Sequence, residues 1–148
     1  MKTPTEQADL AQDINIVKLH LKNKLWRTTT PKELQHIKWQ ALISELCDLH
    51  KVDKPAFIIE PETHPHYNVL TKTIVSNKYS VITMLHELAH HIWGSSERTA
   101  QFYSETTFLT AYKPAQKKLV RDKRGFLVKK EVVPNTNTGA PATAGEGN

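Results

Sequence analysis

The segment 79–93, "YSVITMLHELAHHIW", constrains the fold of this chain more than any other stretch. Its apolar residues recur at the spacing of a helix that is buried along one side. They are Val81, Ile82, Leu85, Leu88, Ala89 and Ile92. Residues four apart on a helix differ by about 40° in direction and lie about 6 Å apart along the axis. His86 and His90 are therefore expected to point the same way from a buried helix.

This pair of histidines predicts a metal site. Two imidazoles on one helix face can bind a single Zn²⁺ through ring nitrogens at about 2.0–2.1 Å. Glu87 directly follows the first histidine, in the His-Glu-x-x-His arrangement in which a glutamate acts as general base on water. We therefore predict His86 and His90 as zinc ligands and Glu87 as the catalytic residue. The competing interpretation is two ordinary histidines on a helix surface.

The third zinc ligand is expected after this helix. A catalytic zinc usually has three protein ligands and one open position. No histidine follows His91, so the candidates are two acids, Glu97 and Glu105. On an unbroken helix Glu97 would lie about 10 Å from His90 along the axis. The sequence Gly94-Ser95-Ser96 can break the helix and fold the chain back. We favour Glu97, with Glu105 as the alternative. The competing interpretation of each is a solvated helix charge.

Composition indicates a soluble globular protein. Hydrophobic residues make up 39% and charged residues 24% of the 148 residues. No apolar run approaches the roughly 18 residues of a membrane helix, and the N-terminal stretch has no signal-peptide core. Cys47 is the only cysteine, so an internal disulfide is excluded and a metal site must use His, Asp and Glu. A chain that can form no internal disulfide is expected to be cytoplasmic, because disulfides are rare in the cytosol. Cys47 itself is expected to be buried and inert.

The rest of the chain predicts an α+β fold. Helices are expected over 5–26, 31–50, 79–93 and 97–112, and strands over 55–60 and 69–76, with a loop over 61–68 between them. Thr30, Pro31 and Glu33 form the start signal of the second helix. The inner face of this helix is predicted as Leu34, Ile37, Ala41, Leu42, Leu46 and Leu49. The strand at 69–75 is the expected place for an extended peptide to pair by its backbone.

One domain is expected over residues 1–133, ending in a possible basic hairpin over 119–133 that turns between Asp122 and Gly125. Residues 134–148 are small and polar and predict a disordered tail. The formal charge is +5, and residues 113–130 hold eight Lys or Arg against one acid, Asp122. Such a run is more often a solvated face. Contact with nucleic acid is the alternative.

Several further side chains are weighed as site residues. His64 and His66 form either a second metal site or, as we favour, part of a mobile loop. Tyr67, Tyr79 and Tyr103 are candidates for stabilising an oxyanion, although each is more often a packing residue. His91 points about 100° away from His90 and is expected to lie beside the site or on the surface.

The stretch "ITMLHELAHHIWGSSERTAQFYSETTFL" resembles the ImmA/IrrE group of small gluzincin-type metallopeptidases, which is frequent in bacteria, mobile elements and phages. The resemblance covers residues 69–109. It implies a small zincin-like domain: two N-terminal helices, a small sheet, the active-site helix and a following helix. It also implies His86, His90 and Glu97 as zinc ligands with Glu87 as base. The gap between His90 and Glu97 is shorter than the family usually has.

The function expected from these features is zinc-dependent hydrolysis of peptide bonds in a protein or peptide substrate. A second resemblance, to SprT-like proteases that act near DNA, would suit the basic hairpin, although the third ligand of that group is usually a histidine. A non-catalytic, metal-dependent regulatory module is the rival from another class. A basic DNA-binding protein is a further alternative, which predicts steep salt dependence and no zinc requirement.

Overall fold

The computed structural model describes residues 3–22, 32–112 and 119–129, in the mixed α+β arrangement that was predicted. Contacts divide the chain into two compact units, Met1–Lys113 and Pro114–Asn148. Among the described residues, none of the helices has the length and apolar content that a membrane span requires. The predicted tail 134–148 and the start signal of the second helix at Thr30 and Pro31 lie outside the described residues, as does the side chain of Glu33.

The first unit begins with helices. A short 3-10 helix, η1 (Gln7–Leu10), leads into α1 (Ala11–Lys22), and α3 spans Lys32–His50. One face of this first helical segment, made of apolar residues at helical spacing, packs against the core. Leu10 and Val17 are buried, and Ile14 and Leu21 are partly buried against the core.

The predicted inner face of the second helix was only partly right. Leu42 and Leu46 are buried, but Leu34 and Ile37 are 45% and 59% exposed, and Ala41 is exposed. The residues that complete the buried face of α3 are Trp39, Ile43 and Cys47. Both sets follow helical spacing, so the choice between them depends on which side meets the rest of the core.

The sheet of the first unit has the order β1-β3-β2. Its strands are β1 (Ala56–Ile59), β2 (His66–Asn68) and β3 (Thr73–Ser76). β1 pairs parallel to β3, and β2 pairs antiparallel to it with Tyr67 opposite Ile74.

The predicted loop 61–68 thus contains a strand, and the predicted strand over 69–76 begins only at Thr73. β3 is central, with neighbours on both edges, so the expected pairing of a peptide on this strand is wrong. Within the described sheet, β2 is the edge strand on the side of α4.

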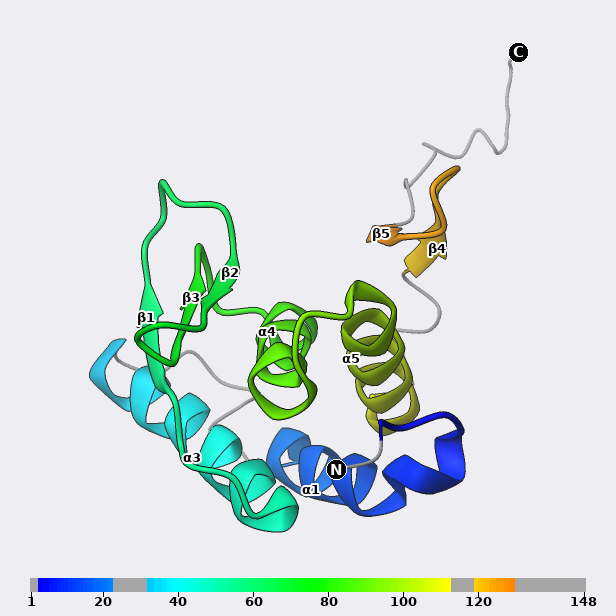
Figure 1. The fold of residues 1–148 in the computed structure, drawn as a ribbon, viewed down its shortest axis with the longest axis horizontal. Helices are drawn as coiled ribbons and strands as arrows, with labels where there is room; N and C mark the ends of the chain where they lie inside the picture. Colours follow the sequence, from blue (N-terminus) through cyan, green and yellow to red (C-terminus); the bar gives the residue numbers. More distant parts are fainter. Residues whose placement is uncertain (1–2, 23–31, 113–118, 130–148) are drawn as a thin grey trace, which may run out of the picture. The chain divides into compact units, whose positions relative to one another are not determined.

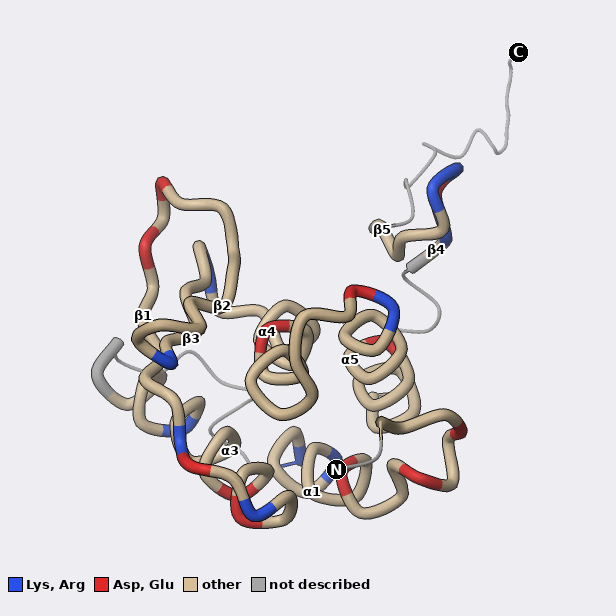
Figure 2. The backbone as a smooth tube through the Cα atoms, in the orientation of Figure 1, with Lys and Arg blue, Asp and Glu red and all other residues tan. Residues whose placement is uncertain are grey.

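Helix α4 (Val81–Trp93) lies between the sheet on one side and α5 (Glu97–Ala111) on the other (Figure 1). Its buried residues are apolar apart from Glu87: Met84, Leu85, Leu88, Ala89 and Ile92. Glu87 is the only Asp, Glu, Lys or Arg in the helix, and it corresponds to the red stretch of the otherwise tan α4 tube (Figure 2). These apolar residues pack into the core of the first unit, so the polar side chains of α4 lie where the core borders solvent.

A short turn reverses the chain between α4 and α5. The Gly94 N–H donates to the His90 carbonyl at 3.0 Å, and Gly94 has φ 103°, a backbone conformation that favours glycine. The Ser96 hydroxyl then caps α5 by accepting from the Thr99 N–H at 3.2 Å. The predicted break at Gly94 is confirmed, and it places the first turn of α5 beside the last turns of α4.

The second unit is described over an antiparallel hairpin, β4 (Leu119–Arg121) and β5 (Leu127–Lys129). The predicted turn is confirmed: the Asp122 carboxylate accepts from the backbone N–H groups of Arg124 at 2.9 Å and Phe126 at 3.0 Å. Two basic side chains of this run make contacts within the hairpin itself. Arg121 donates to the Gly125 carbonyl at 2.7 Å, and Arg124 pairs with Asp122.

A buried polar contact joins three helices of the first unit. Asp13 of α1 is 1% exposed and accepts from His50 of α3 at 2.6 Å and from the Tyr103 hydroxyl of α5 at 2.9 Å. The His50 ring also packs edge-on against Trp93 of α4. Since a buried carboxylate needs such partners, this cluster fixes how the helices meet.

Replacing Asp13 by alanine should therefore destabilise the fold. The change leaves the Tyr103 hydroxyl and His50 without their shared acceptor, which should lower the free energy of unfolding by about 3 kcal/mol. Urea denaturation at equal metal content measures it. Asp48→Ala is the matched control, because its pair with Lys54 is exposed and worth less than about 1 kcal/mol. Equal losses in the two variants would contradict a structural role for the cluster.

Candidate metal centre

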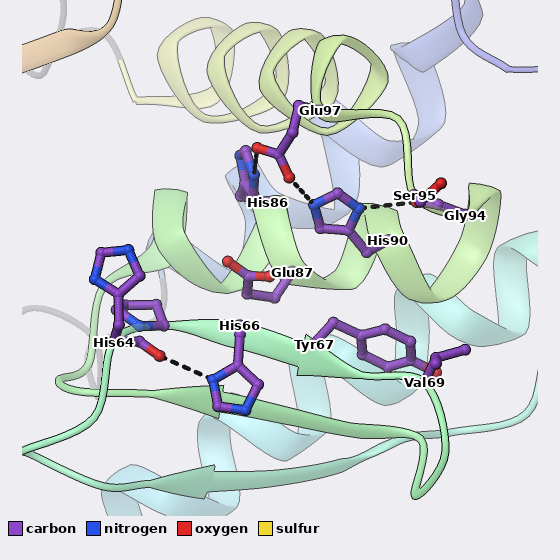
Figure 3. Close-up of a pocket in the computed structure, with 11 residues that line it drawn as sticks. His64, His66, Tyr67, Val69, His86, Glu87, His90, Gly94, Ser95 and Glu97 are labelled. Carbon is purple, nitrogen blue, oxygen red and sulfur yellow. Dashed lines mark hydrogen bonds and ion pairs between the residues drawn. The ribbon is translucent and has the colours of Figure 1, made fainter.

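Three predicted ligands meet at the turn between α4 and α5. The Nε2 atoms of His86 and His90 lie 3.1 Å and 2.7 Å from the two carboxylate oxygens of Glu97 (Figure 3). One atom from each residue falls within 4.8 Å of the other two. Ligand atoms at 2.0–2.1 Å from a tetrahedral zinc lie about 3.3 Å apart. The spacing therefore fits a single small cation bound by two imidazoles and a carboxylate.

Helix geometry and the turn explain how the three side chains converge. His86 and His90 are one turn apart on α4, with their ring centroids 5.1 Å apart. Glu97 is the first residue of α5 and follows the capping Ser96, a position where an acid is also stabilised by the helix dipole. Because the chain reverses at Gly94, the first turn of α5 reaches both imidazoles, which an unbroken helix could not allow.

The backbone orients one of the two imidazoles. His90 Nδ1 donates to the Gly94 carbonyl at 2.8 Å. This bond assigns the Nδ1 proton, so in the neutral ring the Nε2 lone pair faces Glu97. A carbonyl or carboxylate on the far nitrogen is the usual partner of a metal-binding histidine, since it fixes both tautomer and ring direction. The contact therefore prepares His90 to bind a cation.

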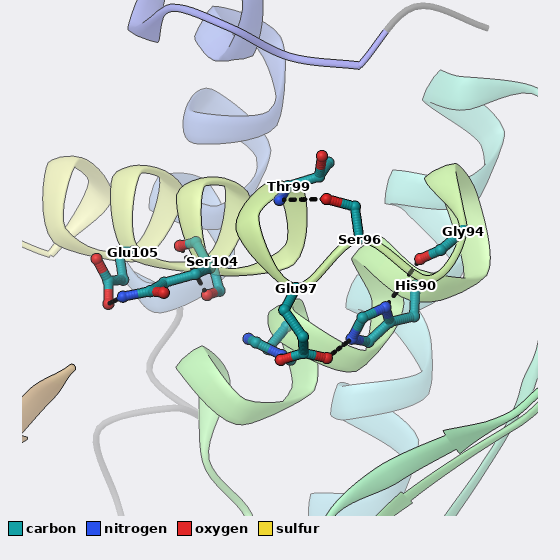
Figure 4. A network of polar contacts seen from close by, with 9 residues as sticks. His90, Gly94, Ser96, Glu97, Thr99, Ser104 and Glu105 are labelled. Carbon is teal, nitrogen blue, oxygen red and sulfur yellow. Dashed lines mark hydrogen bonds and ion pairs between the residues drawn. The ribbon is translucent and has the colours of Figure 1, made fainter. Parts of the chain in front are cut away.

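Glu105, the alternative third ligand, is placed elsewhere. It lies two turns further along α5, is 9% exposed and accepts from the Gln101 side chain at 3.1 Å (Figure 4). Among the described residues, the group with metal-binding geometry contains His86, His90 and Glu97 but not Glu105. The geometry therefore favours Glu97 over Glu105 as the third ligand.

Glu87 projects from α4 toward β2 and lines the same pocket as the three clustered residues (Figure 3). Its side chain is buried, at 6% exposed, and it is not among the three clustered residues. Burial raises the pKa of the Glu87 carboxyl, whereas the nearby imidazoles of His86 and His90 oppose the rise. A carboxylate whose pKa is raised is a stronger base, so this group is suited to accept a proton inside the pocket.

The pocket has a volume of about 560 Å³ and is open to solvent between α4, the start of α5 and β2. His64, His66 and Tyr67 form the wall opposite α4. His64 and His66 were predicted to belong to a mobile loop, whereas the structure places His66 in β2, with its Nδ1 donating to the His64 carbonyl at 2.8 Å. No second cluster of metal-binding geometry involving them occurs in the described part of the chain.

The three tyrosines weighed as oxyanion donors have different places. Tyr103 is buried, and its hydroxyl donates to Asp13. The Tyr79 hydroxyl lies 3.2 Å from His36 Nδ1. Neither tyrosine lines the pocket. Tyr67 does line the pocket, but its hydroxyl donates to His91 Nδ1 at 2.7 Å. His91 Nε2 in turn donates to the Asp53 carbonyl, so His91 lies beside the site as predicted and links β2 to the segment before β1.

Cys47 is buried among apolar residues of α3, as the sequence predicted. Burial, together with the neighbouring Asp48, raises the pKa of the thiol to about 11. The thiol is therefore protonated at neutral pH and is unsuited to bind a metal or attack a substrate.

Comparisons with known protein families, with curated proteins and with solved structures found no match. Support for a metal site therefore comes from the geometry of this chain alone.

Two matched substitutions on α5 separate the candidate third ligands. Glu97→Gln should weaken zinc binding by more than the roughly 10–100-fold that loss of an outer-shell partner costs, because it removes a direct ligand. Glu105→Gln should leave the zinc affinity nearly unchanged. Competition with a chromophoric chelator measures both, and melting curves check that the buried Glu105 position still folds. A larger loss in Glu105→Gln would transfer the ligand role.

Proposed function

We propose that this chain is a zinc-dependent peptidase of small zincin-like architecture. The observation that carries the proposal is the meeting of His86, His90 and Glu97 around one point, with the separate carboxylate of Glu87 in the same pocket. Three ligands with an open position are typical of catalytic zinc sites, whereas structural sites are closed by four protein ligands. Bound zinc would supply a Lewis acid that polarises a carbonyl oxygen and acidifies water.

Glu87 is proposed as the general base. Its carboxylate is buried beside the cluster without belonging to it, which suits a group that takes a proton from the attacking water and passes it to the leaving amine. Burial raises its pKa, so the proton is accepted more readily than by an exposed glutamate. A purely structural or regulatory metal site has no need of such a base, which favours an enzyme over the binding-module alternative.

The edge of β2 is proposed as the place where a substrate binds. β2 forms the wall of the pocket opposite α4, and its outer edge has no strand partner in the described sheet. An extended peptide can add to such an edge through main-chain hydrogen bonds. In that position its backbone runs past Glu87 and the cluster. This supports peptides as the substrate class, in place of the small molecules that an enclosed cavity would select.

Zincin-like architecture is supported by the order of elements around the site. A sheet edge, the motif helix and a following helix that returns an acid to the two histidines occur in the order implied by the resemblance to gluzincin-type peptidases. Nucleic acid as a partner of the basic run 113–130 stays a prediction, since part of that run lies outside the described residues.

Glu87→Gln tests the enzyme proposal. The substitution keeps the size of the side chain but removes its ability to accept a proton, so turnover should fall by about 10²–10⁴-fold. Zinc content and melting temperature should stay those of the parent chain, because the three ligands are unchanged. Cleavage of a random peptide library by the zinc-loaded protein, followed by mass spectrometry, measures turnover.

Glu62→Gln is the control for this experiment, because Glu62 is exposed and does not line the pocket. It should cleave like the parent chain. Loss of zinc from Glu87→Gln would mean that Glu87 is a ligand and not the base. A parent chain that holds zinc but cleaves nothing would favour the regulatory binding module.

A further inference from the structure

A second pocket adjoins the candidate metal centre. It has a volume of about 490 Å³ and shares four lining residues with the first pocket: Tyr67, Val69, His90 and Gly94. The two pockets therefore meet along one groove between β2 and the end of α4. The far end of the second pocket is lined by Lys51, Lys72 and Asp53.

The two lysines at this end are not ion-paired within the described residues. Both are exposed, and neither ammonium group has an ion-pair or hydrogen-bond partner among the described residues. Lys54, close in sequence, differs because it pairs with Asp48 at 3.6 Å. Asp53 adds one negative charge to the same lining, so two cations stand against one anion. The far end of the pocket therefore favours an anionic group of a ligand.

The backbone at both lysines is left-handed. Lys51 has φ 57° and Lys72 has φ 50°, and they are the only non-glycine residues in the described part of the chain with positive φ. At Lys51 this conformation closes the C-terminal end of α3, where the N–H groups of Lys51 and Val52 donate to the carbonyls of Asp48 and Cys47. At Lys72 it belongs to the turn between β2 and β3. The two turns thus fix where both lysines leave the backbone, and both residues line one pocket.

Hydrogen bonds hold both lysines on fixed backbone. The Lys51 N–H donates to the Asp48 carbonyl at 3.2 Å at the end of α3. The Lys72 carbonyl accepts from the Ala56 N–H at 3.1 Å at the start of β1. Across the groove, His91 bridges the Tyr67 hydroxyl and the Asp53 carbonyl. The pocket is thus built from segments that are tied to one another and to the wall of the metal centre.

We propose that the Lys51–Lys72 pocket binds a carboxylate of the peptide held at the metal centre, namely an acidic side chain on the N-terminal side of the bond that is cut. This inference rests on the proposed function. β2 runs from His66, beside Glu87, toward Val69 and the second pocket. Antiparallel pairing is the more stable kind per residue. A peptide antiparallel to β2 places residues N-terminal to the reacting bond against Lys51 and Lys72.

Cleavage specificity tests the proposal in the zinc-loaded protein. In a random library of peptides with blocked ends, Asp and Glu should be enriched about fivefold at one position N-terminal to the cut, as expected for two partly exposed charge pairs. The double variant Lys51→Met, Lys72→Met should lose this enrichment, because it keeps chain length and removes both charges. Lys78→Met is the matched control: it removes an exposed charge that lines neither pocket, and should keep the enrichment.

Binding of small probes tests the pocket without turnover. N-acetyl-glutamate amide, titrated into the ¹⁵N-labelled chain, should shift the backbone amides of Lys51, Asp53 and Lys72. N-acetyl-glutamine amide should not, and the double variant should show no shift. N-acetyl-alanine with a free carboxylate separates a side-chain acid from a chain terminus, and it should shift these amides less than the glutamate probe does.

The outcomes separate the two proposals. Probe binding without any peptide cleavage would overturn the peptidase and leave the carboxylate pocket standing. Cleavage without acidic enrichment, together with no shift at these amides, would overturn the pocket and leave the peptidase. Enrichment on the C-terminal side, or stronger binding of the free terminal carboxylate, would overturn the side-chain assignment.

Discussion

The reversal of the chain at Gly94 is the constraint on which the candidate site depends. It turns α5 back along α4, so that Glu97 meets two imidazoles. On a continuous helix, Glu97 would lie about 10 Å from His90 and about 16 Å from His86 along the axis. Gly94 supplies the positive φ, and Ser96 starts the new helix. The apolar face of α4 then fixes this pair of helices in the core. Local backbone chemistry and core packing thus determine the ligand geometry together.

The edge of β2 links the two pockets. Its outer edge lies across the pocket from α4, and its side chains and the residues that follow it line both pockets. Tyr67 and His91 tie this strand to α4 and to the segment that carries Lys51. A peptide along this edge would meet the base, the metal ligands and the lysines in order. One short strand therefore connects the proposed chemistry with the proposed selectivity.

Sequence patterns predicted which candidate ligands lie together better than they predicted the elements around them. His86, His90 and the break at Gly94 follow from spacing and turn chemistry alone, which are local. β2 was missed because Pro61 and Pro65 indicate a loop, while its three residues become a strand only by pairing with β3. The buried face of α3 was partly wrong because two apolar sets follow helical spacing. Asp13 was not foreseen at all, since its partners lie 37 and 90 residues away.

We propose that His86, His90 and Glu97 bind one zinc ion through nitrogen and oxygen atoms. X-ray absorption at the zinc edge, on protein saturated with zinc and freed of excess metal, tests it most directly. The expected result is one zinc per chain with nitrogen and oxygen neighbours at about 2.0–2.1 Å and the scattering pattern of two imidazoles. A spectrum with a single imidazole, or with sulfur at about 2.3 Å, would contradict the claim, as would a chain that retains no zinc.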